Sequence, residues 1–446
     1  MMKRRYVAMI SAVLCSAMIL SACGNSKKTE SIYTGDKTEV PAWQANLDAI
    51  SPSAYADVEG LDLEPGTYIS VIGRAGGTPY WDEVKKGVEQ AAEDLNESLG
   101  YSGDDKIKVV YNAPDENDNI DEMVNILDEE LARYPDVIAV SSIDESASEV
   151  QFDLATANGI PIVAFDSGNS YQGIQCICRT DNKEAAKTGV KKLCEAIGDS
   201  GEIALLLNDS VSENGKEREA GVKEEIKANH PDVSVVETIY VDELDQLKRK
   251  AAAEQLGMSA EDLAAEAGEK MDDAAQTTGT ANGSGTDTAE TSANGDDGTA
   301  AGGTDTATKD GATAPTVAEK FEEVKSAADK MSNEEAVAYY LKKHPELKGI
   351  FALNETSTQL GIQVLDELDN SDEIQIVGFD AGKEQVKALE DGELDGLVVQ
   401  NPFGMGYAAV IASARTVLEI GNEAEVNTGY VWVTAENMDD ADIKPL

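Results

Sequence analysis

Polar side chains follow several short β-branched stretches of this sequence, and their types suit the recognition of hydroxyl groups. Asp166 follows residues 160–165, and Asp380 follows residues 374–379. Carboxylate, amide and guanidinium groups can form paired hydrogen bonds with neighbouring hydroxyls, and aromatic faces suit the C–H face of a sugar ring. We therefore predict a binding site for a small neutral polyol. The candidate residues are Thr78, Tyr80, Trp81, Ser141, Asp166, Arg218, Asn354, Asp380 and Gln400.

Some of these residues also fit ordinary structural roles. Trp81 shares a spacing of three and four residues with Val84 and Val88, so a place in the core agrees with the periodicity as well as a ligand contact does. Asp, Asn and Ser side chains often stabilise the turn after a strand, which applies to Asp166, Asn354 and Asp380 taken singly. Their joint occurrence at strand ends favours a shared site.

The segment 67–96 shows how such residues would be positioned. Residues 67–72 form a β-branched, aromatic-rich run that predicts a strand covered on both faces. A loop follows, and Thr78 and Pro79 suit the cap and first position of a helix. That helix carries an apolar stripe, so we expect it to pack back on the sheet.

Strands and helices then alternate along the chain. After the opening unit we expect strands at 107–111, 137–140 and 160–165, with helices over 120–131 and 147–157. A second series gives strands at 174–177, 203–207, 233–240, 350–353, 374–379, 397–399 and 430–433, with helices between them and a long helix over 403–420. Alternation at this spacing requires crossover connections, so the sheets should be parallel and doubly wound. The fold class is therefore α/β with two lobes.

An insertion at 246–330 interrupts the second series. Residues 274–316 contain no Val, Ile, Leu, Met, Phe, Tyr or Trp, so this stretch is predicted to be disordered because it has too little apolar surface to bury. Its flanks, 246–271 and 317–330, have helix-forming compositions and predict a polar helical hairpin. A tolerated surface insertion is favoured over a regulatory or partner-binding role.

The N-terminus predicts export. Lys3, Arg4 and Arg5 precede an apolar run at 6–20 that is short for a membrane span, so residues 1–22 are predicted to be a signal peptide. The sequence Leu-Ser-Ala-Cys at 20–23 resembles the lipobox of bacterial lipoproteins. The resemblance implies cleavage before Cys23, lipid on that residue and an extracytoplasmic protein anchored to the cell membrane by lipid alone. An ordinary secretory signal is the alternative. Residues 23–64 are predicted to be a flexible tether.

Composition excludes several classes of function. The 36 Lys and Arg against 85 Asp and Glu give a net charge of −49, which would repel nucleic acid. Cys176, Cys178 and Cys194 do not form a disulfide or metal pattern, and we expect Cys176 and Cys178 to be buried. The sequence contains only two histidines, His230 and His344, so it offers few candidates for a zinc site or for catalysis by histidine. No dinucleotide glycine pattern and no phosphate loop occur, so no enzyme activity, catalytic residue, cofactor or metal is predicted.

The ordered series of motifs resembles the ribose- and galactose-type periplasmic binding proteins, which are solute receptors of ABC importers. The matching stretches are 71–72, 79–81, 86–88, 159–167, 180–182, 350–354, 376–380 and 400–402, with Arg218 before Gly221. The resemblance implies two lobes that close on a small neutral sugar, a monomer, and an ABC permease in the membrane as partner. It implies lobes at 65–178 plus 402–428 and 179–401 plus 429–446, joined by crossings near 178–180, 400–402 and 429–431.

The candidate residues divide between these lobes. The resemblance places Thr78, Tyr80, Trp81, Ser141 and Asp166 in the first lobe and Arg218, Asn354, Asp380 and Gln400 in the second. The sequence departs from pentose binders at Thr78, Ser167 and Glu355, where Asn, Arg and Asp are usual, and Arg74 makes the first loop unusual. The particular sugar is therefore left open. A sensor lipoprotein that presents a sugar or furanose signal to a receptor kinase or chemoreceptor, and a nucleoside receptor, are the alternatives.

Overall fold

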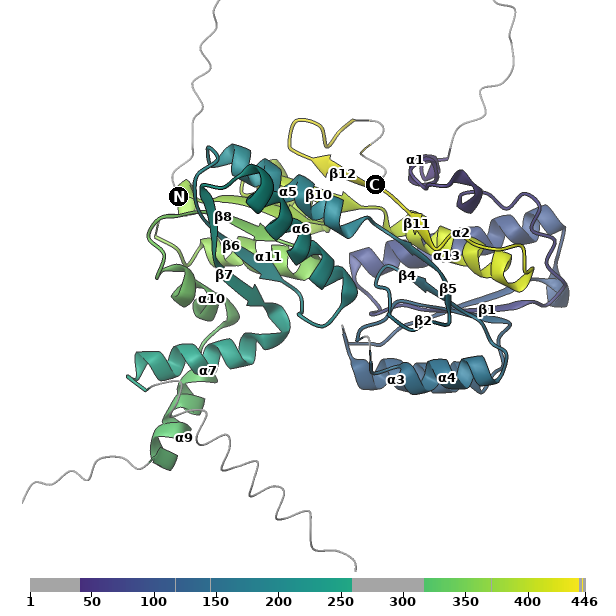
Figure 1. The fold of residues 1–446 in the computed structure, drawn as a ribbon, viewed down its shortest axis with the longest axis horizontal. Helices are drawn as coiled ribbons and strands as arrows, with labels where there is room; N and C mark the ends of the chain where they lie inside the picture. Colours follow the sequence, from purple (N-terminus) through teal and green to yellow (C-terminus); the bar gives the residue numbers. More distant parts are fainter. Residues whose placement is uncertain are drawn as a thin grey trace, which may run out of the picture. The chain divides into compact units, whose positions relative to one another are not determined.

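Two six-stranded sheets, each covered by helices, form the frame of the protein (Figure 1). The computed structural model describes residues 41–116, 118–144, 146–258, 317–369, 371–440 and 443. Strands of the first sheet lie in the order β11-β5-β4-β3-β1-β2, and those of the second in the order β12-β10-β9-β8-β6-β7. We call each sheet with its helices a lobe. The predicted fold class, two doubly wound parallel-sheet lobes, is confirmed.

The first lobe contains only parallel strand pairs. Its strands are β1 (Tyr68–Ile72), β2 (Lys108–Asn112), β3 (Val137–Val140), β4 (Ile162–Phe165), β5 (Ile174–Arg179) and β11 (Glu425–Asn427). Its helices are α1 (Gln44–Asp48), α2 (Pro79–Leu99), α3 (Ile120–Leu131), α4 (Glu149–Ala157) and α13 (Pro402–Val417), with 3-10 turns η1 (Ser53–Tyr55) and η2 (Gly103–Asp105).

The second lobe is parallel except for its edge pair β10–β12. Its strands are β6 (Gly201–Leu207), β7 (Val233–Tyr240), β8 (Leu347–Ala352), β9 (Gln375–Phe379), β10 (Gly396–Gln400) and β12 (Tyr430–Val433). Its helices are α5 (Asn182–Ala196), α6 (Glu213–Asn229), α7 (Leu244–Gln255), α9 (Val317–Ala328), α10 (Asn333–Leu341), α11 (Glu355–Leu365) and α12 (Lys383–Asp391), with 3-10 turns η3 (Val241–Glu243) and η4 (Ser371–Glu373).

The chain passes between the two sheets three times. It leaves the first sheet after Arg179, returns after Gln400 and leaves again after Asn427. The prediction of three crossings is therefore confirmed. Each crossing joins the end of a strand in one lobe to the start of an element in the other.

Alternation along the central strands explains why their sequences are apolar on both faces. Val71 of β1 and Ala139 of β3 contribute to the core that α2 and α13 cover, whereas Ile72 and Ile138 contribute to the core under α3 and α4. Figure 1 shows these two helix pairs on opposite faces of the sheet. Side chains of a strand point alternately to its two faces, so a strand buried on both sides needs apolar residues throughout.

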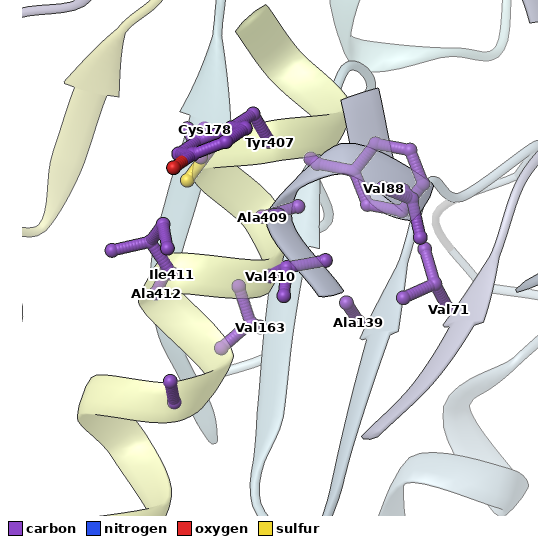
Figure 2. Packing of buried hydrophobic residues seen from close by; sticks show 14 of the residues in the cluster. Val71, Val88, Ala139, Val163, Cys178, Tyr407, Ala409, Val410, Ile411 and Ala412 are labelled. Carbon is purple, nitrogen blue, oxygen red and sulfur yellow. The ribbon is translucent and has the colours of Figure 1, made fainter. Parts of the chain in front are cut away.

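Helices α2 and α13 approach each other closely through glycines. A Cβ atom on Gly87 would lie 1.9 Å from the carbonyl oxygen of Phe403, and one on Gly406 would lie 2.0 Å from that of Val84. Figure 2 shows side chains of α13, among them Val410, in one cluster with Val163 of β4. The helix that follows the second crossing is thus fixed on the helix that carries Tyr80 and Trp81.

The helix predicted over 147–157 is present as α4, but its apolar residues do not all face the core. Val150 and Leu154 are exposed, whereas Phe152 and Ala155 are buried. This helix begins two residues later than expected, at Glu149. Phe152 packs edge-on against Tyr171, and burial of this larger ring decides which face is turned inward.

Residues 42–64 are structured, so the predicted tether is wrong over this range. This segment contains α1 and η1 and packs in the same core as α2 and α13. Ser51 also exchanges backbone hydrogen bonds of 2.8 and 3.0 Å with Asn427 of β11. Its apolar residues are few and irregularly spaced, so the sequence pattern did not predict that they are buried. The buried side chains are Leu47, Ile50, Tyr55, Leu61 and Leu63.

Replacing Tyr55 by Phe is expected to lower the free energy of unfolding by about 1–2 kcal/mol, because it removes a hydroxyl group that forms two hydrogen bonds. The Tyr55 hydroxyl accepts a hydrogen bond from the Glu423 backbone N–H and donates to Asn422 Oδ1 at 3.2 Å. Urea denaturation of both proteins measures the difference. Stability equal to that of the wild type would mean that this segment is not anchored in solution.

The two helices that flank the insertion contact each other. Helices α7 and α9 pack through small side chains that include Ala252 and Val324.

Cys176 and Cys178 are buried, as predicted. The signal peptide 1–22, Cys23 and the stretch 274–316 lie outside the described residues. Among the helices that the structure describes, none has the length and apolarity needed to cross a bilayer.

Candidate functional site

A cavity lies at the carboxyl ends of strands from both sheets. About 660 Å³ of space lies between its walls, part of it open to solvent. Eight of the nine predicted residues line it, and only Ser141 does not. Their contact with a ligand stays a prediction. The lining residues used below are Arg74, Thr78, Tyr80, Trp81, Asp118, Asp166, Asn208, Asp209, Ser212, Arg218, Asn354, Glu355, Asp380 and Gln400.

Asp166 and Asp380 occupy equivalent positions in the two lobes. Each directly follows a buried Phe that ends a strand, β4 or β9. Their φ angles are 55° and 67°, in the left-handed region that Asp tolerates better than most residues. The backbone N–H of Asp166 donates to Cys178 O at 2.9 Å, and that of Asp380 donates to Val398 O at 2.8 Å. The same turn thus presents one carboxylate from each lobe.

Two hydroxyl groups hold the Asp166 carboxylate. Tyr80 Oη donates to Oδ1 at 2.7 Å, and Ser141 Oγ donates to Oδ2 at 2.9 Å. Burial and the charge of Asp166 raise the pKa of Tyr80 well above its ordinary value, so its hydroxyl stays protonated and donates. Ser141 is fully buried behind Asp166. Sequence analysis placed Ser141 among the ligand contacts, but in the structure it positions Asp166.

Arg218, Gln400 and Asp380 form a hydrogen-bonded series on the second lobe. Arg218 Nη2 donates to Gln400 Oε1 at 2.9 Å, and Gln400 Nε2 donates to Asp380 Oδ1 at 2.8 Å. The other Arg218 nitrogens donate to Asn182 and to the carbonyl of Leu353. Burial raises the pKa of Asp380, although Arg218 and Gln400 oppose this shift. All three side chains are less than a tenth exposed, so their directions are fixed before a ligand binds.

Thr78, Trp81 and Asn354 combine structural roles with places on the cavity wall. Thr78 Oγ1 accepts the backbone N–H of Trp81 at 3.3 Å and caps α2. Asn354 caps α11 in the same way, through the backbone N–H of Ser357 at 2.8 Å. Trp81 belongs to the core cluster and also stands edge-on to Tyr80, with ring centroids 5.3 Å apart. Each of these three residues therefore has a structural role and also lies on the cavity wall.

Eleven of the described residues that line the cavity were not among the predicted site residues, and five of these are polar or charged side chains discussed below. They follow β1, β2, β6 and β8 at the same edge of the sheets, so the strand-end rule that selected Asp166 also applies to them. Arg74 had stood out as unusual in its loop. The five are Arg74, Asp118, Asn208, Asp209 and Glu355.

Glu355 is a carboxyl group whose pKa is raised in the site. Burial, with the negative charge of Asp380 beside it, raises the pKa of Glu355 to about 7, while a backbone hydrogen bond from Tyr80 opposes the shift. Its Oε1 and the Oε1 of Gln385 are both buried, and neither has a donor among the described residues. The raised pKa comes first from burial, and because Tyr80 of the first lobe contacts Glu355, the joining of the lobes contributes to that burial.

Two doubly wound lobes that share one polar cavity define a two-lobed solute receptor. The chain belongs to the family described as periplasmic binding protein domain, whose model matches residues 69–278 and 297–419. A search of curated proteins found no match.

Solved structures support this fold over most of the chain. A carbohydrate transporter solute binding protein from Agrobacterium radiobacter, in complex with D-arabinose, is 20% identical with a TM-score of 0.58, covering 85% of this chain and 98% of its own. GanP, a glucose-galactose binding protein from Geobacillus stearothermophilus, is 18% identical with a TM-score of 0.57, covering 84% and 99%. A sugar-binding protein of a sugar ABC transporter from Bacillus halodurans is 22% identical with a TM-score of 0.55, covering 84% and 99%.

Proposed function

We propose that this protein captures a small neutral sugar between its two lobes and delivers it to the permease of an ABC transporter. The observation that carries this proposal is the equivalent placement of Asp166 and Asp380, one from each lobe, on the wall of one cavity. Carboxylates held in this way accept hydrogen bonds from hydroxyl groups, and Gln400 and Arg218 add donors. The aromatic rings of Tyr80 and Trp81 suit the apolar face of a sugar.

Similar proteins agree with this ligand class. Of the solved structures described above, two are sugar or carbohydrate transporter proteins, one of which holds D-arabinose, and the third is a glucose-galactose binding protein. We infer that the sugar is bound and released unchanged, because the described residues that line the cavity include neither His nor Cys, and both aspartates are held by neutral donors. The Leu-Ser-Ala-Cys sequence at 20–23 supports attachment to the outer face of the cell membrane by lipid on Cys23.

A thermal-shift panel tests the ligand class. Pentoses, hexoses, their amino and acidic derivatives, and nucleosides are each added in large excess to the purified protein. A sugar at 100 times its dissociation constant should stabilise the protein by about 2.7 kcal/mol, so a neutral sugar should give a clear rise in melting temperature. A shift with nucleosides alone would move the protein to another ligand class. The absence of a shift with every sugar would contradict the proposal.

The affinity for this sugar is expected to depend on pH through Glu355. Its pKa is about 7 where the lobes meet, against an ordinary value of 4.5 in water. Bringing the lobes together therefore takes up a proton between these values, which favours the joined form at low pH and weakens it as pH rises through about 7. We expect binding to be up to about tenfold tighter at pH 6 than at pH 8, measured by titration calorimetry.

Glu355→Gln is the matched variant for this prediction. Its amide keeps the shape of the side chain and carries no charge, so it mimics the protonated form at every pH. The pH dependence should then disappear, while the affinity stays close to the wild-type value at pH 6. Equal slopes in both proteins would assign the dependence to another group.

A further inference from the structure

Four side chains on the cavity wall form a contact that runs from one lobe to the other. Arg74 Nε and Nη2 donate to Asp118 Oδ1 at 2.9 and 2.6 Å within the first lobe. Arg74 Nη2 also reaches Asp209 Oδ2 of the second lobe at 3.3 Å. In the opposite direction, Asn208 Nδ2 donates to Asp118 Oδ2 at 2.7 Å. We call these four residues the clasp, and both lobes contribute a donor and an acceptor to it.

Each end of the clasp is fixed to an element that also presents a residue of the proposed sugar site. Arg74 lies in the loop that leads into α2, which carries Tyr80. Asp209 Oδ1 accepts the backbone N–H groups of Val211 at 3.0 Å and Ser212 at 2.6 Å. Ser212 in turn caps α6, the helix of Arg218. Movement of either ligand-binding helix would therefore strain the clasp.

The charged side chains of the clasp form ion pairs with one another. Arg74 and Asp209 are each only 5% exposed. Burial would raise the pKa of Asp209, but Arg74 and the neighbouring donors outweigh it and leave that pKa below its ordinary value. Because the Arg74 guanidinium contacts carboxylates of both lobes, parting the lobes would cost it one of them. A buried ion pair that loses one partner is strongly destabilised, so the clasp favours the joined form.

All four residues of the clasp line the same cavity as Asp166 and Asp380. A ligand long enough to reach this wall would have to push Arg74 away from Asp209, so Asp209 would lose its cation and Arg74 would lose one of its two carboxylates. A short ligand leaves the contact intact. The clasp thus distinguishes ligands by their length, because it borders the space beside Asp166, whose negative charge also acts on Arg74.

We propose that Arg74 is a specificity-determining residue, which with Asp118, Asn208 and Asp209 forms a wall that limits the ligand to a single sugar ring. This inference rests on the proposed function and deepens it. The wild type admits a monosaccharide and excludes disaccharides that contain it, because a second ring would break the contact between the lobes.

The test uses the monosaccharide that gives the largest thermal shift, together with disaccharides that carry the same sugar at either end. Calorimetry with the wild type should show monosaccharide binding and at least 30-fold weaker disaccharide binding. Arg74→Ala should weaken monosaccharide binding about tenfold, because closure loses the clasp, and strengthen disaccharide binding, so that the selectivity falls at least tenfold. Asn208→Ala removes one crossing bond without a change of charge, and it should give a smaller fall in the same direction.

Lys192→Ala is the matched control, since it removes a cation whose ion pair with Glu195 is exposed and outside the cavity. It should leave both affinities unchanged. If Arg74→Ala fails to fold, Asn208→Ala alone decides the result. Monosaccharide binding with unchanged selectivity in the folded variants, or equal binding of both sugars by the wild type, would overturn the role of the clasp and leave the proposed function standing. No binding of any sugar by the wild type would overturn both.

Discussion

Asp380→Asn is expected to weaken sugar binding at least about 100-fold while the protein stays folded, because hydrogen bonds to a charged group contribute about 1.5–3 kcal/mol each. Asn keeps the shape of the side chain and also tolerates the φ of 67° at this position. The change removes the negative charge that Gln400 and the Glu355 N–H now hold in place. Titration calorimetry with the sugar found in the thermal-shift panel measures the loss.

Asp199→Asn is the control for this variant. Asp199 also lies in the second lobe with a positive φ, of 55°, but its side chain is 62% exposed, pairs with His230 and does not line the cavity. Its replacement should leave the affinity unchanged. If Asp380→Asn bound the sugar as tightly as the wild type does, Asp380 would have to be removed from the site.

Gly406→Ala is expected to lower the free energy of unfolding by about 3 kcal/mol, the upper end of the usual cost of overpacking a core. The new Cβ atom would lie 2.0 Å from the carbonyl oxygen of Val84, so α13 and α2 would have to move apart. The atoms that the new Cβ atom would meet belong to the backbone of α2, so no rotation of a side chain can relieve the contact. Urea denaturation of the purified proteins gives the difference.

Gly361→Ala makes the same change in a helix of the second lobe. There the new Cβ atom would meet Ile376 Cδ1 at 3.0 Å, the movable end of a side chain. Ala also favours a helix over Gly by about 1 kcal/mol, so we expect little net change or a small gain. Equal losses from both substitutions would show that the close approach of α2 and α13 is not what makes Gly406 necessary.

Much of the fold could be predicted because its signals are local. The strand, cap and helix predicted within residues 67–96 each depend on neighbours a few positions away. The structure contains all three, as β1 followed by α2 with Thr78 as its cap. Asp166 and Asp380 could be found for the same reason, since each follows its strand directly. The rule that strand ends meet at one edge then brought residues of both lobes to one cavity.

The remaining features depend on partners distant in the sequence. Tyr55 is fixed by Asn422, 367 residues further along the chain, and no pattern around Tyr55 records this. Arg74 and Asp209 are 135 residues apart, so their contact follows only from the way the lobes meet. Ser141 was assigned to the ligand because strand-end position does not say whether a hydroxyl faces the cavity or the carboxylate behind it.

Titration calorimetry of the wild-type protein with neutral pentoses and hexoses tests the central claim most directly. One sugar bound between two lobes that both supply ligand contacts predicts one-to-one binding, with affinity lost in Asp166→Asn on the first lobe as well as in Asp380→Asn on the second. Binding that survives either substitution unchanged would show that one lobe suffices, and heat changes absent for every sugar would show that the cavity serves another ligand.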